Sequence, residues 1–316
     1  MATERKLVGV IMLISTHAMH ATLPVPFVAA GWTLVADSTF GTTTINTITS
    51  NSFGQYIVAG NSGKVATSTD SGFSWVARTS NFSTSNIYSS AYYDGLYMIG
   101  GSSGKIATST DGITWTLRAS GFGASAVLGI TYAPSASLWI AVGGSGKLAT
   151  SIDGIEWVLR TSSFGTSFIN EVYATETLII AVGYDGKLAT STNGLDWTQR
   201  TSSFVYDTIN DVVANESRTQ FVAVGDSGKI ATSSNGTSWT QVYPPPSFGA
   251  FRITSVDANS ESYVAGGTAG KLATSLSGVG WTQRPSNFGL DNINAVLLQD
   301  SIGIAVGGSG KIAYSV

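Results

Sequence analysis

Aspartates recur at a fixed place in a repeated Ser-x-Asp-Gly pattern, where a carboxylate could bind calcium or act as a general acid. The pattern places Asp70, Asp111 and Asp153 in register with Asn193, Asn235 and Ser277. A change from Asp to Asn or Ser does not suit an acid catalyst. All these side chains, however, can accept hydrogen bonds from backbone N–H groups of a tight turn. The pattern therefore favours a turn-forming role over calcium binding, and we predict no metal or cofactor site.

Arginines are the second group that could do chemistry, because several guanidinium groups together can hold an anionic substrate. Five of them, Arg78, Arg118, Arg160, Arg200 and Arg284, stand three residues after a tryptophan. The remaining acidic residues, including Glu171, Asp185, Asp207 and Asp211, are scattered. A regular spacing spreads the arginines over the molecule, so we expect them to cover strand edges with their aliphatic stems. No catalytic residue is predicted.

A repeat of 40 to 42 residues runs through the chain and must position all these groups. A Gly-Lys pair marks each unit, with the lysines at Lys64, Lys105, Lys147, Lys187, Lys229, Lys271 and Lys311. Each unit contains four short β-prone runs separated by Gly, Asp, Asn and Ser, for example Trp139–Val142 and Trp197–Arg200. A period near forty residues with four strands in each unit predicts a β-propeller.

The two ends of the chain predict how the ring closes. The last unit stops after its third strand, whereas residues 31–35 (Gly-Trp-Thr-Leu-Val) supply an isolated fourth strand. We therefore expect strand 31–35 to pair with 311–315, which makes residues 31–316 an all-β, seven-bladed propeller with four-stranded blades. This closure would remove exposed strand edges between the first and last blades.

The turns between second and third strands should share one face with the connectors between blades, so all seven lysines should ring that face. The ring could attract an anionic polysaccharide or an acidic protein. The alternative, which we favour, is that each lysine stem lies along its own blade while its charged head is solvated, because a position kept in all seven blades usually serves the blade. Departures from the repeat are better candidates for recognition. We expect such departures on this face of the adjacent blades 4 to 6, at Tyr184, Asp185, Tyr206, Asp207 and Pro244–Pro246. The alternative is that they are neutral variation of the loops. Tyrosine next to a carboxylate suits sugar or protein recognition.

The inner strands should present small polar residues to the central channel: Asn46, Asn170, Glu171, Asn210, Asp211 and Asn294. We expect them to line a water-filled channel rather than a designed pocket.

Composition limits the possible partners. The chain has no cysteine, 11% charged residues and a net charge of −3. These values exclude disulfides and thiolate metal sites and argue against a nucleic-acid partner.

Residues 1–30 stand outside the repeat. Their apolar run, residues 7–14, is too short to span a membrane. We expect either a docking arm for a partner subunit or a secretory signal. His17 and His20, without a third ligand, suggest polar residues rather than a metal site.

The Ser-x-Asp-Gly hairpins, each followed by a tryptophan, resemble the Asp-box (BNR) repeat of sialidases, related glycosidases, a photosystem II assembly factor and many bacteriophage proteins. The resemblance covers residues 31–316. The resemblance to sialidases would imply a six-bladed propeller with three converging arginines, a tyrosine nucleophile and an acid/base aspartate. This chain instead has seven units, and five of its arginines occupy the same position of the repeat.

The uniform repeat and the intact arm most resemble bacteriophage virion components. We therefore predict a non-enzymatic structural or binding propeller of a virion, whose residues 1–30 contact other virion proteins and whose propeller contacts a partner or host polysaccharide. A secreted lectin-like binder and a sialidase-like glycosidase are the alternatives.

Overall fold

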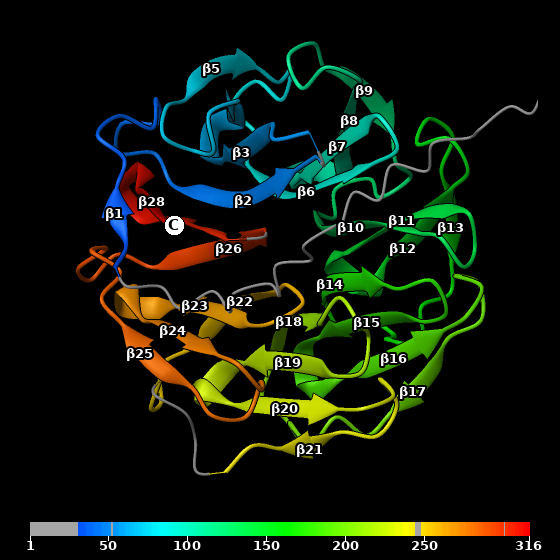
Figure 1. Cartoon of the computed structure of the whole chain (residues 1–316). Helices are drawn as coiled ribbons and strands as arrows, with labels where there is room; N and C mark the ends of the chain where they lie inside the picture. Colours follow the sequence, from blue (N-terminus) through cyan, green and yellow to red (C-terminus); the bar gives the residue numbers. More distant parts are fainter. Residues whose placement is uncertain (1–30, 52, 244–247, 300) are drawn as a thin grey trace, which may run out of the picture.

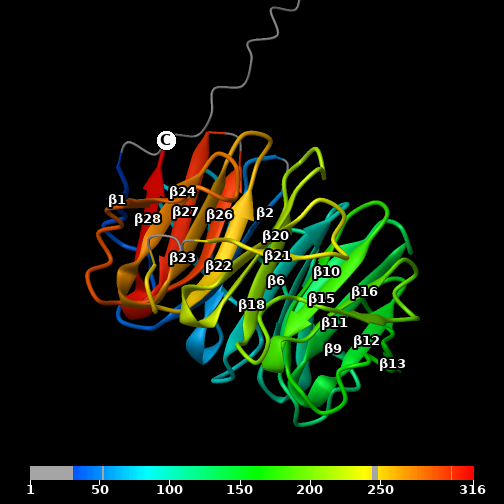
Figure 2. The ribbon, with the colours of Figure 1, turned by 90° about the horizontal axis from the view of Figure 1, so that it is seen from below.

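The computed structural model describes residues 31–51, 53–243, 248–299 and 301–316. The predictions for the arm or signal at residues 1–30, for His17 and His20, and for Pro244–Pro246 lie outside the described residues. Seven four-stranded antiparallel sheets surround a central axis (Figure 1). Figure 2 shows the same sheets from the side, stacked next to one another around the ring. The prediction of a seven-bladed propeller is confirmed.

Each blade runs from an inner strand at the axis to an outer strand at the rim. The inner strands are β2 (Ile45–Ser50), β6 (Ile87–Tyr93), β10 (Val127–Ala133), β14 (Ile169–Ala174), β18 (Ile209–Ala214), β22 (Ile253–Ala258) and β26 (Ile293–Gln299). The second strands are β3 (Tyr56–Gly60), β7 (Leu96–Gly101), β11 (Leu138–Gly143), β15 (Ile179–Gly183), β19 (Phe221–Gly225), β23 (Tyr263–Gly267) and β27 (Ile302–Gly307). Blades 1 to 7 are numbered in this order.

The third strands are β4 (Lys64–Ser68), β8 (Lys105–Ser109), β12 (Leu148–Ser151), β16 (Leu188–Ser191), β20 (Ile230–Ser233), β24 (Leu272–Ser275) and β28 (Ile312–Ser315). The outer strands are β5 (Val76–Thr79), β9 (Thr116–Ala119), β13 (Val158–Arg160), β17 (Thr198–Arg200), β21 (Thr240–Gln241), β25 (Thr282–Arg284) and, for blade 7, β1 (Thr33–Leu34). Outer strands begin one residue after the tryptophan rather than at it, because that tryptophan still belongs to the hairpin.

The ring closes through strands from both ends of the chain. Thr33 pairs with Tyr314, Leu34 pairs with Ala313, and the Val35 amide donates to the Ile312 carbonyl at 2.9 Å. The blue strand β1 lies beside the red strand β28 in Figure 1. The predicted pairing of 31–35 with 311–315 is therefore confirmed.

The core lies between blades. The second strands are almost entirely buried on both faces, as expected for sheets covered by a neighbour on each side. One phenylalanine per connector is also fully buried: Phe40, Phe82, Phe122, Phe164, Phe204, Phe248 and Phe288. These rings fill the gaps where neighbouring blades diverge, which stabilises the ring as a whole.

Single 3-10 turns join the second and third strands: η1 (Asn61–Gly63), η2 (Ser102–Gly104), η3 (Gly144–Gly146), η4 (Tyr184–Gly186), η5 (Asp226–Gly228), η6 (Thr268–Gly270) and η7 (Gly308–Gly310). They contact the connectors that enter each inner strand, for example through the Asn61 amide and the Thr44 carbonyl, 2.9 Å apart. We call the face formed by these turns and connectors the turn face. Among the described residues, no helix has the length and apolarity needed to cross a bilayer.

Candidate functional site

The lysine ring of the turn face is held by the scaffold. The ammonium groups of six lysines donate to the carbonyl of a connector phenylalanine: Lys64 to Phe40, Lys105 to Phe82, Lys147 to Phe122, Lys187 to Phe164, Lys229 to Phe204 and Lys311 to Phe288, at 2.6–3.2 Å. The seventh, Lys271, lies 5.3 Å from the centre of the Phe251 ring. These lysines tie their own blade to the connector that enters it, so they serve the blade, but six of the charged heads bond to the connector rather than only to solvent.

A second partner satisfies several of these lysines. Lys105 and Lys187 also donate to the hydroxyls of Ser85 and Ser167, at 2.9 and 2.8 Å. At the equivalent position, Asp207 forms an ion pair with Lys229 at 2.5 Å, and this hydrogen bond lowers the pKa of the Asp207 carboxyl. Two of the seven lysines, Lys229 and Lys311, are neutralised by ion pairs with Asp207 and Asp291, and six of the seven ammonium groups are anchored to the connectors.

The repeated arginines and aspartates are likewise used inside the blades. Arg78, Arg118, Arg160, Arg200 and Arg284 each donate their Nε to a third-strand threonine hydroxyl, at 2.9–3.0 Å. Asp111 accepts hydrogen bonds from the Ile113 and Thr114 amides, which lower its pKa to about 2. These contacts support the turn role of the Asp position, and among the described residues no group of three His, Cys, Asp or Glu side chains could hold a metal ion.

A cavity of about 630 Å³ occupies the axis, bounded by the inner strands of all seven blades. The six predicted channel residues, Asn46, Asn170, Glu171, Asn210, Asp211 and Asn294, all line it. Every inner strand has a β-bulge between its first and third residues, for example between Ile169 and Glu171. The bulge turns the second residue toward the axis out of the usual alternation.

Most second residues of the inner strands join neighbouring blades. The side-chain amides of Asn46, Asn170, Asn210 and Asn294, and the Thr254 hydroxyl, each donate to the first-residue carbonyl of the next inner strand, at 2.5–3.0 Å. Blades 2 and 3 have Tyr88 and Leu128 at this position. Their channel wall is therefore aromatic and aliphatic where the other blades present amides or, in blade 6, a hydroxyl.

The opposite wall is acidic. Asp211 accepts hydrogen bonds from the amides of Val212 and, on the next blade, Val256, at 2.7 and 2.9 Å. Asp257 similarly accepts from Ala258 and, on blade 7, Leu298, at 2.9 and 2.8 Å.

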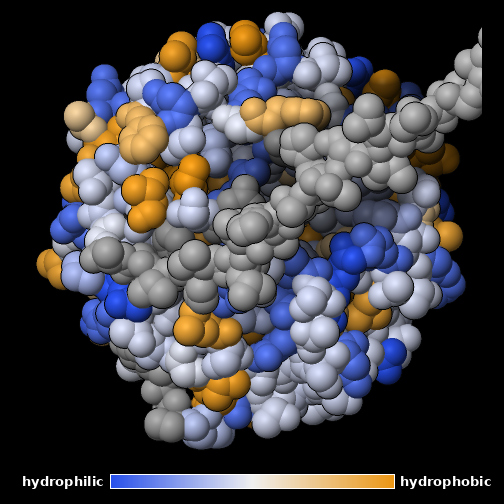
Figure 3. All heavy atoms as spheres, in the orientation of Figure 1, coloured by the Kyte–Doolittle hydropathy of each residue, from blue (hydrophilic) through white to orange (hydrophobic). Residues whose placement is uncertain are grey.

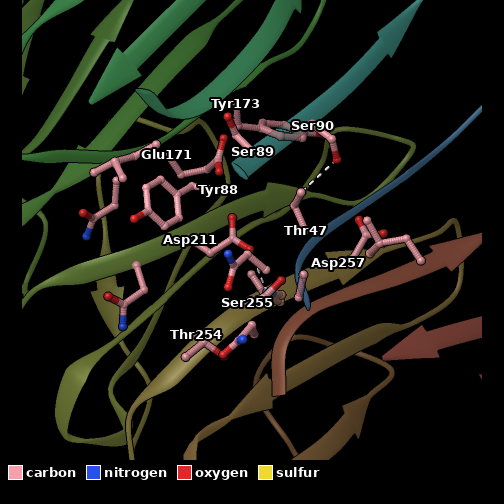
Figure 4. A pocket seen from close by; sticks show the side chains of 18 of the residues that line it. Thr47, Tyr88, Ser89, Ser90, Glu171, Tyr173, Asp211, Thr254, Ser255 and Asp257 are labelled. Carbon is pink, nitrogen blue, oxygen red and sulfur yellow. Dashed lines mark hydrogen bonds between the residues drawn. The ribbon is translucent and has the colours of Figure 1, made fainter. Parts of the chain in front are cut away.

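Removal from bulk water outweighs these hydrogen bonds and raises the pKa of Asp211 to about 6 and that of Asp257 to about 7. The same desolvation, together with the negative charge of Asp211, raises the pKa of Glu171 well above its ordinary value. Figure 4 shows these three carboxyls with Tyr173 around the cavity.

The predicted recognition residues lie together on the turn face of blades 4 and 5. The backbone of Val205 abuts turn η4, since a Cβ at Gly186 would lie 2.5 Å from the Val205 carbonyl oxygen. Tyr184 is 42% exposed and packs against Phe168 with ring centres 5.1 Å apart, whereas Tyr206 is 86% exposed. We call Phe168, Tyr184, Val205 and Tyr206 the partner patch. Asp185 accepts a hydrogen bond from Ser167, so both predicted acids, Asp185 and Asp207, have partners in the scaffold.

Val205 has an unusual backbone. Its φ is +62°, in the left-handed region, and its side chain is 67% exposed. The equivalent residue is glycine in five of the other six connectors (Gly41, Gly123, Gly165, Gly249 and Gly289) and serine in the sixth (Ser83). A β-branched residue in this region is a true outlier. Blade 5 therefore displays an apolar side chain where the fold prefers none.

Some of these features could not be read from the sequence. Asp257 was missed because the bulge moves later residues of its strand toward the axis. Phe168 and the conformation of Val205 were also missed, although alignment of the seven connectors, which read Phe-x-x-x-x-Ile or, once, Phe-x-x-x-x-Val, would have marked both. On the face shown in Figure 3, hydrophobic side chains form separate small groups among hydrophilic ones.

Comparisons with known proteins bear on the fold alone. No protein-family model and no curated protein sequence was found to match the chain. Among solved structures it is similar to YCF48 bound to a D1 peptide, with 16% identity, a TM-score of 0.71 and coverage of 93% of this chain and 98% of that one. A catalytically inactive virginiamycin B lyase from Staphylococcus aureus with quinupristin gives 12% identity, a TM-score of 0.80 and coverage of 90% and 99%. The WD40 repeats of RRP9 give 11% identity, a TM-score of 0.72 and coverage of 92% of this chain and 99% of that one.

Proposed function

We propose that this chain is a non-enzymatic binding propeller that holds a protein partner on the partner patch of blades 4 and 5. One observation carries the proposal: Val205 keeps a left-handed backbone and presents its side chain, with that of Tyr206, to solvent. Strain of this kind costs about 1–3 kcal/mol and persists at sites where the conformation serves a function. The positions that repeat in every blade are used by the scaffold, so recognition belongs to the positions that depart from the repeat.

The chemistry of the patch favours a protein over a polysaccharide. Tyrosine and other aromatic residues supply much of the binding energy at protein interfaces, where their rings are desolvated by a partner. Sugar recognition needs polar groups beside the ring that fix the hydroxyls. The acids nearest the tyrosines, Asp185 and Asp207, already accept hydrogen bonds from Ser167 and Ser227.

The solved neighbours support a binding role in general terms. The YCF48 structure contains a bound peptide, and the WD40 repeats of RRP9 share the architecture. The resemblance of the Ser-x-Asp-Gly hairpins to bacteriophage propellers is the support for placing the protein in a virion, with other virion proteins or host polysaccharide as partners. A secreted lectin-like propeller is the alternative location and role.

The arginine geometry supports a non-enzymatic role over the sialidase-like alternative. The five repeated arginines are held on or beside the outer strands by threonine hydroxyls. Only Arg252 lines the axial cavity, and its guanidinium forms an ion pair with Asp226 at 2.6 Å. A three-arginine clamp for a carboxylate substrate is absent from the lining of that cavity within the described residues.

Selection from a displayed random-peptide library tests the proposal, with a glycan array run in parallel. We expect wild-type protein to select peptides whose binding is lost in a Tyr184→Ala/Tyr206→Ala variant. The control is Phe53→Ala, which removes an equally exposed aromatic ring (84%) from a loop between first and second strands. Selected peptides that bind the double variant as well as wild type would refute the patch, and saturable glycan binding lost in the double variant would replace the protein partner with a sugar.

A further inference from the structure

The axial cavity has two chemically different walls. Blades 4 to 6 contribute the carboxyls of Glu171, Asp211 and Asp257. Blades 2 and 3 contribute Tyr88 and Leu128, which replace the amides found in other blades, together with further aromatic and aliphatic side chains. Such a cavity matches a ligand that is positively charged at one end and apolar along its stem.

The acidic wall lacks a cation of its own. Within the described ranges four ion pairs form, and none includes Glu171, Asp211 or Asp257. Arg252 reaches the cavity lining but is held by Asp226. Carboxylates taken out of bulk water are normally paired, because an unpaired charge there is costly. The acidic wall therefore leaves room for a positive charge supplied from outside.

The space next to Glu171 contains a further unsatisfied polar group. Ser89 lines the same cavity and is only 5% exposed. Its hydroxyl is buried and has no hydrogen-bond partner. Between the strands of Ser89 and Glu171 lies Gly129, where a Cβ would stand 3.0 Å from Glu171 Oε1. Glu171 receives one hydrogen bond, from the Val172 amide at 2.9 Å. Glu171 and the Ser89 hydroxyl thus both keep unused hydrogen-bonding capacity in the lining of the cavity.

We infer that the central channel binds an alkylammonium or alkylguanidinium group, with its charge between Glu171 and Asp211 and its aliphatic stem along the wall of Tyr88 and Leu128. An ammonium has three donors, and the carboxylates supply charge-assisted acceptors for them. The source is either a free alkylamine or the lysine or arginine side chain of a bound protein. Tyr184 lines this cavity as well as belonging to the partner patch, but the inference rests on the carboxyls and does not depend on the patch.

Binding should depend on pH in a defined direction. The groups that face Asp211 are Glu171 and Tyr173 on β14, Asp257 on β22, and the ion-paired Arg252 at the start of β22. Desolvation keeps part of the carboxyl population protonated near pH 6. A cation binds the ionised form, so affinity should increase from pH 5.5 to 8 and binding should release protons.

Calorimetric titration of the full chain tests the inference with three probes: 1,5-diaminopentane, N-acetyl-lysine methylamide and N-acetyl-norleucine methylamide. We expect saturable binding of one or both amines, none of the uncharged norleucine probe, and about ten- to a hundredfold weaker binding in Glu171→Gln and in Asp211→Asn. A preference for the lysine probe identifies a protein side chain as the source, and a preference for the diamine identifies a free amine.

The control is Glu156→Gln, an exposed hairpin carboxylate whose loss should leave affinity unchanged. Thermal unfolding of each variant establishes that it folds. The inference is overturned if wild type binds neither amine, if the norleucine probe binds equally, or if both folded channel variants retain wild-type affinity. Tyr206→Ala changes the patch without changing a residue of the cavity lining, so failure of either site can be recognised separately.

Discussion

Replacing Val205 with glycine should stabilise the propeller while weakening its capture of a partner. At φ +62° a residue with a Cβ costs about 1–2 kcal/mol relative to glycine. Glycine in turn costs about 0.5–1 kcal/mol, because its unfolded chain has more conformational freedom to lose. Val205 is mostly exposed, so little apolar burial is lost. We therefore expect Val205→Gly to raise the free energy of unfolding by about 0.5–1 kcal/mol.

The reverse substitution provides a matched control in the neighbouring connector. Gly165 occupies the equivalent position at φ +63°, and a Cβ built there meets no atom within 4 Å. Gly165→Val should therefore introduce torsional strain without a clash and destabilise the fold by about the amount that Val205→Gly gains. The double variant should return close to wild type, since the two connectors enter different blades.

Urea unfolding at equilibrium is the assay, with partner-peptide binding measured on the same samples. A more stable Val205→Gly variant that binds more weakly would show that stability has been given up for recognition. If Val205→Gly is neutral or destabilising while Gly165→Val is tolerated, the left-handed conformation carries no strain and the argument for the patch loses its main support.

Three further predictions concern the scaffold and the channel. Lys187→Met should lower the free energy of unfolding by about 1–2 kcal/mol, because the Phe164 carbonyl and the Ser167 hydroxyl lose their donor. The same variant should bind polyanions as wild type does. Urea unfolding measures the first effect, and retention on a heparin column measures the second. Asp111→Ala should lower the free energy of unfolding by about 1 kcal/mol at pH 7 and by less near pH 2. The lowered pKa of Asp111 gives a contribution to stability that is present above about pH 4 and lost as pH falls through about 2. A difference between variant and wild type that stays constant in thermal melts across this range would contradict the prediction. Asp257→Asn should become more stable relative to wild type, by about 1–2 kcal/mol, as pH rises from 5 to 8. The pKa of Asp257 is raised, so its contribution to the stability of the wild type is complete below about pH 4 and is lost as pH rises through about 7. Urea unfolding curves of both proteins at the two pH values measure this change.

The architecture could be predicted from the sequence because it follows from periodic features. Seven Gly-Lys pairs, in register with tryptophan and phenylalanine, define the blades, and the missing fourth strand at one end matches the spare strand at the other. The detail of each blade was less accessible. In six of the seven connectors a serine stands two residues before the phenylalanine, for example Ser80 before Phe82. Its hydroxyl donates to a turn carbonyl and accepts from the phenylalanine amide, an arrangement that composition does not reveal.

The two candidate sites could be predicted only in part from the sequence, and the physical reason is different for each site. Tyr184 and Tyr206 were found because they interrupt a repeated pattern on the surface. The channel was described as lined by small polar groups, but its chemistry depends on which side chains the bulges turn inward. Asp257 stands two residues beyond the polar pair of its strand, and only the three-dimensional arrangement places it in the lining of the same cavity as Asp211 and Glu171.

A closed ring of similar blades also explains why the two candidate sites lie where they do. Each repeated side chain (Lys, Arg, Ser or the hairpin Asp) satisfies a neighbouring group, so changing it harms the blade without creating a site. Positions that touch only solvent or the axial cavity are free of that constraint. Val205 and Tyr206 use this freedom on the turn face and Glu171 uses it at the axis, whereas Asp211 and Asp257 also accept backbone hydrogen bonds from the next blade. Recognition in this fold should therefore vary with the connectors and the inner strands while the hairpins and third strands stay constant.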